Sequence, residues 1–291
     1  MSLSILIPTF NDECHALVSA LALQAQAVEG LQWEILVADD GSTDAHVVAA
    51  NKRIEQLEHC TYIIRCENSG RAAIRNFLAQ KAQYERLLFV DADMKVVRAD
   101  FVQRYLDCDG TVVYGGYTVG KGTRDNLRYL YERASEPAQT AERRAMKPYQ
   151  DFHTSNFMIQ RTLMLSTPLD ERFRHYGYED VLFGKQFQEK GIRIHHIDNP
   201  TGFFTFEDNA HFVAKTEEGL RTLYQFRDEL TGYSHLLQVV NKLQRFHLVR
   251  PLQWLFRLSG SALRRNLCGN RPSLLFFRCY KLGYFLSQDH I

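Results

Sequence analysis

Short apolar runs alternate with longer amphipathic segments through residues 4–90. The apolar runs predict strands at residues 4–7, 34–38, 62–65 and 87–90. The segments between them predict helices at about 12–27, 44–57 and 71–83. The last strand is apolar throughout instead of alternating, which is typical of a strand covered on both faces. The pattern therefore predicts βαβ units and an α/β fold with a mostly parallel sheet flanked by helices.

The later pattern divides the chain further. Residues 110–200 are less regular: Gly115, Gly116, Gly120 and Gly122 flank a basic stretch, and residues 192–197 have a strand pattern. After residue 215 the pattern is helical, with few strand signals. We therefore predict a domain over residues 1–215, with halves 1–110 and 111–215, followed by a helical C-terminal extension over residues 216–291.

Composition and charge exclude several classes of protein. The apolar content of 45% and charged content of 24% are ordinary for a soluble globular protein, and the net charge of +1 gives no reason to expect nucleic acid as a partner. The six cysteines are scattered without a C-x-x-C pair, which argues against a zinc site or a disulfide framework. The N-terminus has no signal-peptide pattern and no apolar run reaches about 18 residues, so we expect a cytoplasmic protein without a transmembrane helix.

Polar clusters follow three of the predicted strands, at residues 8–11, 39–42 and 91–93. In an open α/β sheet, ligands bind outside the carboxyl ends of the strands. Acids gathered there are unfavourable unless a positive group neutralises them, and a divalent cation is the simplest candidate because hard cations favour carboxylate oxygen. For Asp91 and Asp93 the alternative is a purely structural turn or helix cap, since aspartate favours both.

Five segments occur in a characteristic order: SILIPTFN, VADDGSTD, NSGRAAIRN, FVDADM and GYEDVLFG. Each is a weak motif alone, but together they resemble the family 2 glycosyltransferases over residues 2–212, roughly seven-tenths of the chain. The resemblance implies a GT-A fold, with a Rossmann-like, mostly parallel sheet and here a helical C-terminal extension. It also implies transfer of a sugar from a nucleotide-diphosphate sugar, a UDP-sugar above all, to an acceptor hydroxyl with inversion.

The same resemblance assigns roles to individual residues. It places nucleotide binding at Pro8, Thr9, Phe10, Asn11, Asp39, Asp40, Arg71, Asp91 and Ala92. Asp39 would accept a hydrogen bond from the uracil ring, and Asp91 would contact the ribose or an ordered water. Asp93 would ligate Mn²⁺ or Mg²⁺ bridging the diphosphate, with His211 as a further ligand of metal or phosphate. For His211 a structural or surface role is an equal alternative. A departing nucleoside diphosphate develops negative charge, so the chemistry itself favours a metal.

The pair Glu179-Asp180 resembles the acidic pair of the family. The resemblance implies that Asp180 is the general base for the acceptor hydroxyl and that Glu179 holds the acceptor. The alternative is a helix N-terminus enriched in acids, which the helix dipole favours. Asn156 lies in a segment that resembles one facing the donor sugar and the acceptor. Arg75 follows Arg71 by one helical turn, and it either contacts phosphate or belongs to a solvated face.

Other protein classes match parts of the pattern. In a phosphatase-type hydrolase the Asp-x-Asp pair normally follows the first strand, whereas here it follows the fourth. A nucleotidyltransferase would carry a glycine-rich loop where Pro8-Thr9-Phe10 stands. A non-catalytic binding relative would lose the acids, and both acidic pairs are present. The Gln-x-x-Arg-Trp motif of processive synthases is missing, which predicts one sugar per encounter.

The C-terminal part has an unusual charge pattern. Residues 245–281 contain eight Lys or Arg residues and no Asp or Glu, with aromatic residues interleaved. Basic, aromatic amphipathic helices suit an anionic membrane surface, which would place the protein at the inner face of the membrane and favour a lipid-linked saccharide acceptor. The alternative is an extension packed on the catalytic domain, or on a second subunit in a homo-oligomer, with its basic face solvated. The pattern leaves both interpretations open.

Overall fold

The structure is a computed structural model that describes residues 1–290. Within these residues the main sheet has seven strands in the order β3-β2-β1-β4-β8-β6-β9. The strands are β1 (Ser2–Thr9), β2 (Gln32–Asp39), β3 (Cys60–Ile64), β4 (Arg86–Val90), β6 (Val112–Tyr114), β8 (Asn156–Gln160) and β9 (Ile194–His196). Strands β1 to β4 are parallel, and β8 runs antiparallel to both β4 and β6. The predicted mostly parallel sheet is confirmed.

Helices cover both faces of this sheet because alternate strand residues are apolar on each side. Along β1, Ile5 and Ile7 pack with α1 (His15–Gln26) and α4 (Phe101–Leu106), whereas Leu6 packs with α3 (Arg71–Lys81) on the opposite face. Thr9 pairs in register with Asp39 at the ends of β1 and β2, so the polar residues that follow these strands meet at one edge.

The middle of the chain contains more regular structure than its pattern predicts. A second sheet is formed by β5 (Met94–Val96), β10 (Thr201–Phe203) and β7 (Tyr117–Val119). The remaining helical elements up to residue 189 are α2 (Ala45–Asn51), η1 (Lys52–Gln56), α5 (Leu127–Ser135), η2 (Glu136–Ala138), α6 (Ala141–Ala145), α7 (Arg161–Ser166) and α8 (Glu179–Glu189). The strands of the second sheet have only three residues each, too short for a hydrophobic period to predict.

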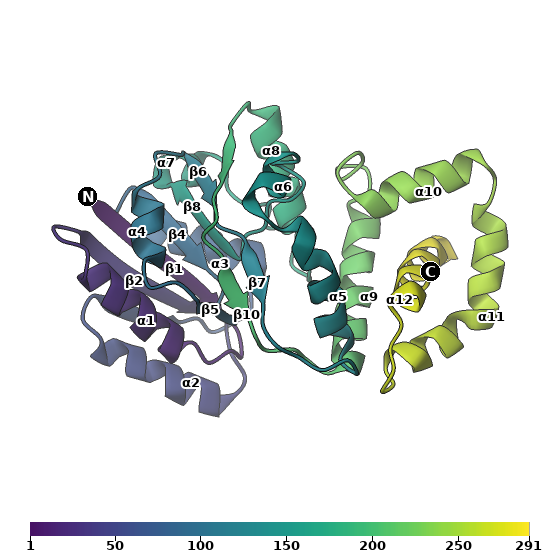
Figure 1. The fold of residues 1–291 in the computed structure, drawn as a ribbon, viewed down its shortest axis with the longest axis horizontal. Helices are drawn as coiled ribbons and strands as arrows, with labels where there is room; N and C mark the ends of the chain where they lie inside the picture. Colours follow the sequence, from purple (N-terminus) through teal and green to yellow (C-terminus); the bar gives the residue numbers. More distant parts are fainter. Residues whose placement is uncertain (291) are drawn as a thin grey trace.

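The C-terminal helices lie beyond the sheet, next to α5, in Figure 1. They are α9 (Asn209–Gln225), α10 (His235–Arg245), α11 (Val249–Leu267) and α12 (Leu274–Leu286), ending in η3 (Ser287–His290). The boundary predicted at residue 215 falls inside α9. Phe173 and Leu182 share one apolar cluster with Leu220 and Phe285, so the extension is packed on the preceding domain. Within residues 1–290, no helix is apolar over enough length to cross a bilayer.

Asn156, at the start of β8, is fully buried. Its Nδ2 donates to the carbonyl oxygens of Gly116 at 2.8 Å and Asn199 at 2.9 Å, and its Oδ1 accepts from the Tyr105 hydroxyl at 2.7 Å. A buried amide needs such partners, and these three join separate segments of the sheet region. The position of Asn156 does not support its predicted role in facing a sugar, because its side chain has no exposed surface.

Replacing Asn156 by alanine tests this structural role. We expect Asn156→Ala to lower the free energy of unfolding by about 3 kcal/mol, because two carbonyl groups and one hydroxyl lose their partner in a site closed to water. Chemical denaturation measures the change. Asn241→Ala, at an exposed position of α10, is the matched control and should change the value by less than about 0.5 kcal/mol. Equal stability of the two variants would contradict the assignment.

Candidate active site

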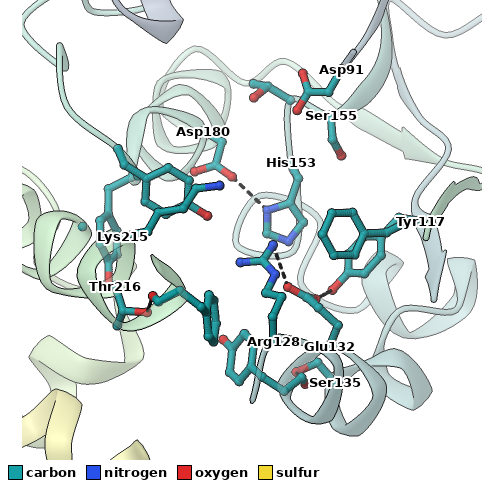
Figure 2. A pocket seen from close by; sticks show the side chains of 18 of the residues that line it. Asp91, Tyr117, Arg128, Glu132, Ser135, His153, Ser155, Asp180, Lys215 and Thr216 are labelled. Atoms are coloured by element: carbon teal, nitrogen blue, oxygen red, sulfur yellow. Dashed lines mark hydrogen bonds and ion pairs between the residues drawn. The ribbon is translucent and has the colours of Figure 1, made fainter. Parts of the chain in front are cut away.

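A cavity of about 410 Å³ lies where β4 ends and α3 and α8 begin. Its sheet side carries Arg71, Asp91, Asp93, Glu179 and Asp180, all predicted as site residues. The opposite wall comes from α5, α9 and α12, which contribute Arg128, Lys215 and Lys281. Figure 2 shows acidic and basic side chains from these separate elements pointing into one space. The fold therefore brings the central predicted acids together.

Asp91 is held in place by the protein. Its carboxylate forms an ion pair with Arg75, whose side chain is only 2% exposed, and its backbone N–H donates to the Ser155 carbonyl oxygen at 2.9 Å. Arg75 also donates to the carbonyl oxygen of Arg71 at 2.9 Å. Arg75 thus belongs neither to a solvated face nor to the cavity lining. It fixes the end of β4 against the start of α3.

Asp93 differs from Asp91, because its carboxylate makes no hydrogen bond or ion pair with any residue in 1–290. Burial and the charge of Asp91 raise the pKa of Asp93, against the opposing charges of Arg71 and Lys215. Desolvation also raises the pKa of Asp12, which lies within electrostatic range of the same two cations. A half-buried carboxylate without a partner is an incomplete arrangement that a cation would complete.

Arg71 connects the two acidic pairs. It begins α3, and its Nη1 lies 3.8 Å from Oε1 of Glu179 while its guanidinium stacks 5.0 Å from the Tyr176 ring centroid. The preceding Gly70 has φ of 91°, and a Cβ there would lie 2.9 Å from the Arg174 carbonyl oxygen. Burial raises the pKa of Glu179, and the positive charge of Arg71 opposes this rise. The second carboxylate oxygen of Glu179, Oε2, is buried and has no hydrogen-bond partner.

Asp180 lies in the first turn of α8 and pairs with a histidine that the motifs did not single out. Nδ1 of His153 is 2.8 Å from Oδ2 of Asp180, and Oδ1 accepts from the Val181 N–H at 2.8 Å (Figure 2). Burial acts to raise the pKa of Asp180, but the hydrogen bond and charge of His153 outweigh it and the pKa is lowered. Burial acts to lower the pKa of His153, and Asp180 raises it overall. The two groups therefore stabilise each other's charged forms.

The carboxylates of Asp39 and Asp40 accept hydrogen bonds from donors within the protein. Asp39 is fully buried and accepts from the Ser42 N–H at 2.7 Å and from the Tyr62 hydroxyl. Asp40 accepts from the Gly70 N–H at 2.9 Å and so orders the turn before α3. Asp40 therefore has a structural role, and its predicted nucleotide contact stays a prediction. The predicted uracil contact of Asp39 stays a prediction, and a base can reach this carboxylate only if its present surroundings rearrange.

The loop after β1 is held against the segment that follows β2. Asn11 adopts φ of 55° and its Oδ1 accepts from the N–H groups of Thr43 and Asp44 at 2.9 and 3.0 Å. Thr9 is buried and donates to the Asp12 carbonyl oxygen at 2.8 Å, whereas Phe10 is 42% exposed at the edge. The other two predicted contacts are the half-buried Pro8 and the buried Ala92. None of these side chains lines the cavity itself.

The structure does not bring His211 to Asp93. His211 is exposed in the first turn of α9, outside the cavity lining, and within residues 1–290 no three His, Cys, Asp or Glu side chains gather in a metal-binding arrangement. The position of His211 therefore does not support its predicted role as a further ligand of metal or phosphate. Lys215, one turn further along the same helix, lines the cavity and acts electrostatically on Asp93 instead.

The wall opposite the acids contains residues that no motif indicated. Arg128 and Glu132, one turn apart on α5, pair at 2.8 Å, and the Tyr117 hydroxyl donates to Glu132 at 2.8 Å (Figure 2). Lys281 of α12 lies 4.9 Å from the Tyr131 ring centroid. Only the long-range packing of α5, α9 and α12 reveals these contacts, although the acid-free stretch around Lys281 was visible in the sequence.

The chain is similar to several glycosyltransferases. It is 22% identical over 254 residues to "Putative glycosyltransferase EpsH" of Bacillus subtilis, covering 84% of this chain and 64% of that protein. It is 32% identical over 91 residues to an "Uncharacterized glycosyltransferase" of Haemophilus influenzae, covering 31% of this chain and 36% of that protein. The matches thus span less than two thirds of these relatives.

Two groups of solved structures share the fold. A crystal structure of S. aureus TarS 1-349 in complex with UDP-GlcNAc superimposes with a TM-score of 0.51 at 16% identity, covering 100% of this chain and 91% of that one. The mannosyltransferase PcManGT from Pyrobaculum calidifontis, in complex with GDP-Man and Mn²⁺, gives 0.56 at 14% identity, covering 98% and 84%. At such identities the likeness concerns the fold, and it confirms the predicted GT-A architecture.

The model of the family described as "Glycosyl transferase family 2" matches residues 4–165. This match includes β1 to β8 and the residues from Pro8 to Asp93 that surround the ends of the parallel strands. Since it spans more than half of the chain and agrees with the fold and with the acids at the sheet's edge, the chain belongs to glycosyl transferase family 2.

Proposed function

We propose that this chain transfers a sugar from a nucleotide-diphosphate sugar, probed first as a UDP-sugar, to an acceptor hydroxyl by metal-assisted single displacement with inversion. The observation that carries the proposal is the cavity that holds both the unpartnered carboxylate of Asp93 and the His153-paired carboxylate of Asp180. One carboxylate suits a cation at the leaving group, and the other suits a proton acceptor. A non-catalytic binding protein would need the first but not the second.

The donor is proposed to lie along the end of β1 and the start of α3. Phe10 is exposed at the end of β1 and offers an aromatic face to a base. Arg71 lines the cavity and is proposed as a phosphate partner. The solved structures of similar fold were bound to UDP-GlcNAc in one case and to GDP-Man in the other, which supports a nucleotide-sugar donor. Lys215, beside Asp93, is proposed as a second cation for the diphosphate.

The residues present fit a divalent cation. Asp93 is a free carboxylate at the cavity, and Mg²⁺ or Mn²⁺ is commonly held by one or two protein carboxylates together with phosphate oxygens and waters. The lack of a three-residue ligand cluster within residues 1–290 agrees with such a shared site. When bound, the cation would supply positive charge against the departing diphosphate.

Asp180 is proposed to take the acceptor's proton. The acceptor oxygen bonds to the anomeric carbon while the bond from that carbon to the diphosphate oxygen breaks, and the hydroxyl proton passes to the carboxylate of Asp180. His153 and the Val181 N–H keep that carboxylate ionised and oriented. Glu179, held beside Arg71, has one oxygen free to accept a hydroxyl of the acceptor. This route needs no covalent enzyme intermediate.

We further propose that α11 contacts an anionic membrane surface. Its outer face exposes Trp254 by 64%, Leu255 by 53% and Leu258 by 65%, although each is apolar. Arg250 and Arg257 are exposed on the same helix, and no Asp or Glu occurs in residues 245–281. An exposed apolar face next to uncompensated cations complements a surface of anionic lipid, and a lipid-linked saccharide acceptor would then be held near the cavity.

Turnover of nucleotide sugars tests the catalytic proposal. With Mn²⁺ and a panel of UDP-, GDP- and dTDP-sugars, we expect release of one nucleoside diphosphate from the parent and a loss of about 10² or more in kcat for Asp180→Asn. In His153→Asn the acidic limb of the kcat/KM profile should move to higher pH. The base must be ionised to accept a proton. When His153 is removed, the effect of burial is no longer opposed by this residue, and the pKa of Asp180 rises.

His235→Asn, exposed at the start of α10, is the control for a general effect of removing a histidine and should leave the profile in place. Full activity of Asp180→Asn across the panel would contradict the proposed base. An acidic limb that stays in place, or moves to lower pH, in His153→Asn would contradict the role given to this pair.

Vesicle co-sedimentation tests the membrane contact. We expect the parent to sediment with vesicles containing phosphatidylglycerol but not with pure phosphatidylcholine, and the double variant Trp254→Ser, Leu258→Ser to lose most of that binding. Leu23→Ser, which removes an apolar residue 68% exposed on α1, is the control and should bind like the parent. Equal sedimentation of parent and double variant, or a vesicle-independent dimer broken by the double variant, would oppose the proposal.

A further inference from the structure

The two sides of the cavity carry opposite charges. Its sheet side carries four carboxylates, whereas α5, α9 and α12 present the three cations Arg128, Lys215 and Lys281. Two of these cations have an acidic partner within the protein. Arg128 pairs with Glu132 at 2.8 Å, and Lys215 lies 3.5 Å from Glu207. The third cation has no such partner.

Lys281 makes no hydrogen bond or ion pair with any residue in 1–290. Its ammonium lies 4.9 Å from the Tyr131 ring centroid and 4.8 Å from that of Phe277, so aromatic faces hold it from two sides. Burial and the charge of Arg278 lower the pKa of Lys281. An ammonium that lines a cavity without an anionic partner is available to bind an anionic ligand.

Lys281 lies at the end of the cavity formed by Tyr131 and Phe277, whereas Lys215 lies 4.8 Å from the Tyr176 ring centroid. Lys215 acts electrostatically on Asp93 and Asp12, at the proposed diphosphate position. The charges that act on Lys281 are instead those of Arg278 and Glu132. The two lysines therefore interact with different groups of the cavity.

The same cavity also carries polar side chains that suit a polyhydroxy ligand. Gln139 and Ser135 follow Tyr131 along the same wall, and Oε1 of Gln139 is buried without a hydrogen-bond partner. A buried amide oxygen in that state is an acceptor for a ligand hydroxyl. The acidic side chain that acts electrostatically on Lys281 is Glu132, and Arg128 and Tyr117 already engage its carboxylate.

We propose that this end of the cavity is an acceptor subsite for an anionic saccharide or polyol, in which Lys281 binds a phosphate or carboxylate of the acceptor and Gln139 accepts one of its hydroxyls. The inference rests on the proposed function, since it names the acceptor class of the same site. It makes the C-terminal extension part of substrate selection, because α12 supplies the selective charge.

Matched pairs of small ligands test the subsite. The full chain, saturated with UDP and Mn²⁺, is titrated by ligand-observed NMR with methyl β-glucuronide against methyl β-glucoside, and with glycerol 3-phosphate against glycerol. We expect the anionic member of at least one pair to bind about tenfold or more tightly than its neutral partner, and the pair that shows it distinguishes carboxylate from phosphate. Lys281→Met should abolish the difference and Lys281→Arg should retain most of it.

UDP binding by each protein is measured in parallel, which also reports folding. Lys242→Met, an identical change at an exposed position of α10, is the control and should keep the anion preference. Intact UDP binding with no anion preference in the parent, or a preference that survives in Lys281→Met, overturns the subsite alone. A tenfold loss of UDP affinity in Lys281→Met assigns this lysine to the donor and overturns it too. Anion preference in a parent that does not bind UDP would instead overturn the proposed function.

Discussion

The buried ion pair between Arg75 and Asp91 organises the site. Because Arg75 is 2% exposed, its charge must be matched inside the protein, and Asp91 provides the match at the end of β4. The same arginine donates to the carbonyl oxygen of Arg71, and the Asp91 N–H reaches the segment that carries His153. Three segments are thereby fixed around one charge. Of the two acids after β4, Asp93 is the one whose carboxylate has no hydrogen-bond or ion-pair partner within residues 1–290, and the predicted ribose or water contact of Asp91 stays a prediction.

The C-terminal helices belong to the site and are not an appendage. Helix α9 continues through the predicted domain boundary and carries Lys215, and α12 packs on α9 and carries Lys281. The apolar cluster that joins Phe173 to Phe285 holds this arrangement. The two interpretations of the basic extension are therefore compatible. Its inner face packs on the domain and lines the cavity, while the outer face of α11 remains exposed.

The sequence predicted what depends on local pattern. Strands β1 and β4 could be predicted because buried parallel strands are apolar over most of their length. The positions of Asp93 and Asp180 could be predicted because short motifs place them at a strand end and a helix start. The sequence did not predict contacts that depend on the direction of a side chain or on a partner far away in the chain. Asn156 lies in a suggestive segment but points into the core, and the partner of Asp180 comes from 27 residues away. The Lys281 contacts depend on packing between α5 and α12, which hydrophobic periodicity does not encode.

The central claim is that Asp93 is left without a protein partner in order to hold a divalent cation against the diphosphate of the donor. Isothermal titration of UDP into the parent and into Asp93→Asn, each with Mn²⁺ and with EDTA, tests it most directly. We expect Mn²⁺ to tighten UDP binding to the parent by about tenfold or more, and we expect Asp93→Asn to lose this gain. Equal enhancement by Mn²⁺ in both proteins, or none in the parent, would contradict it.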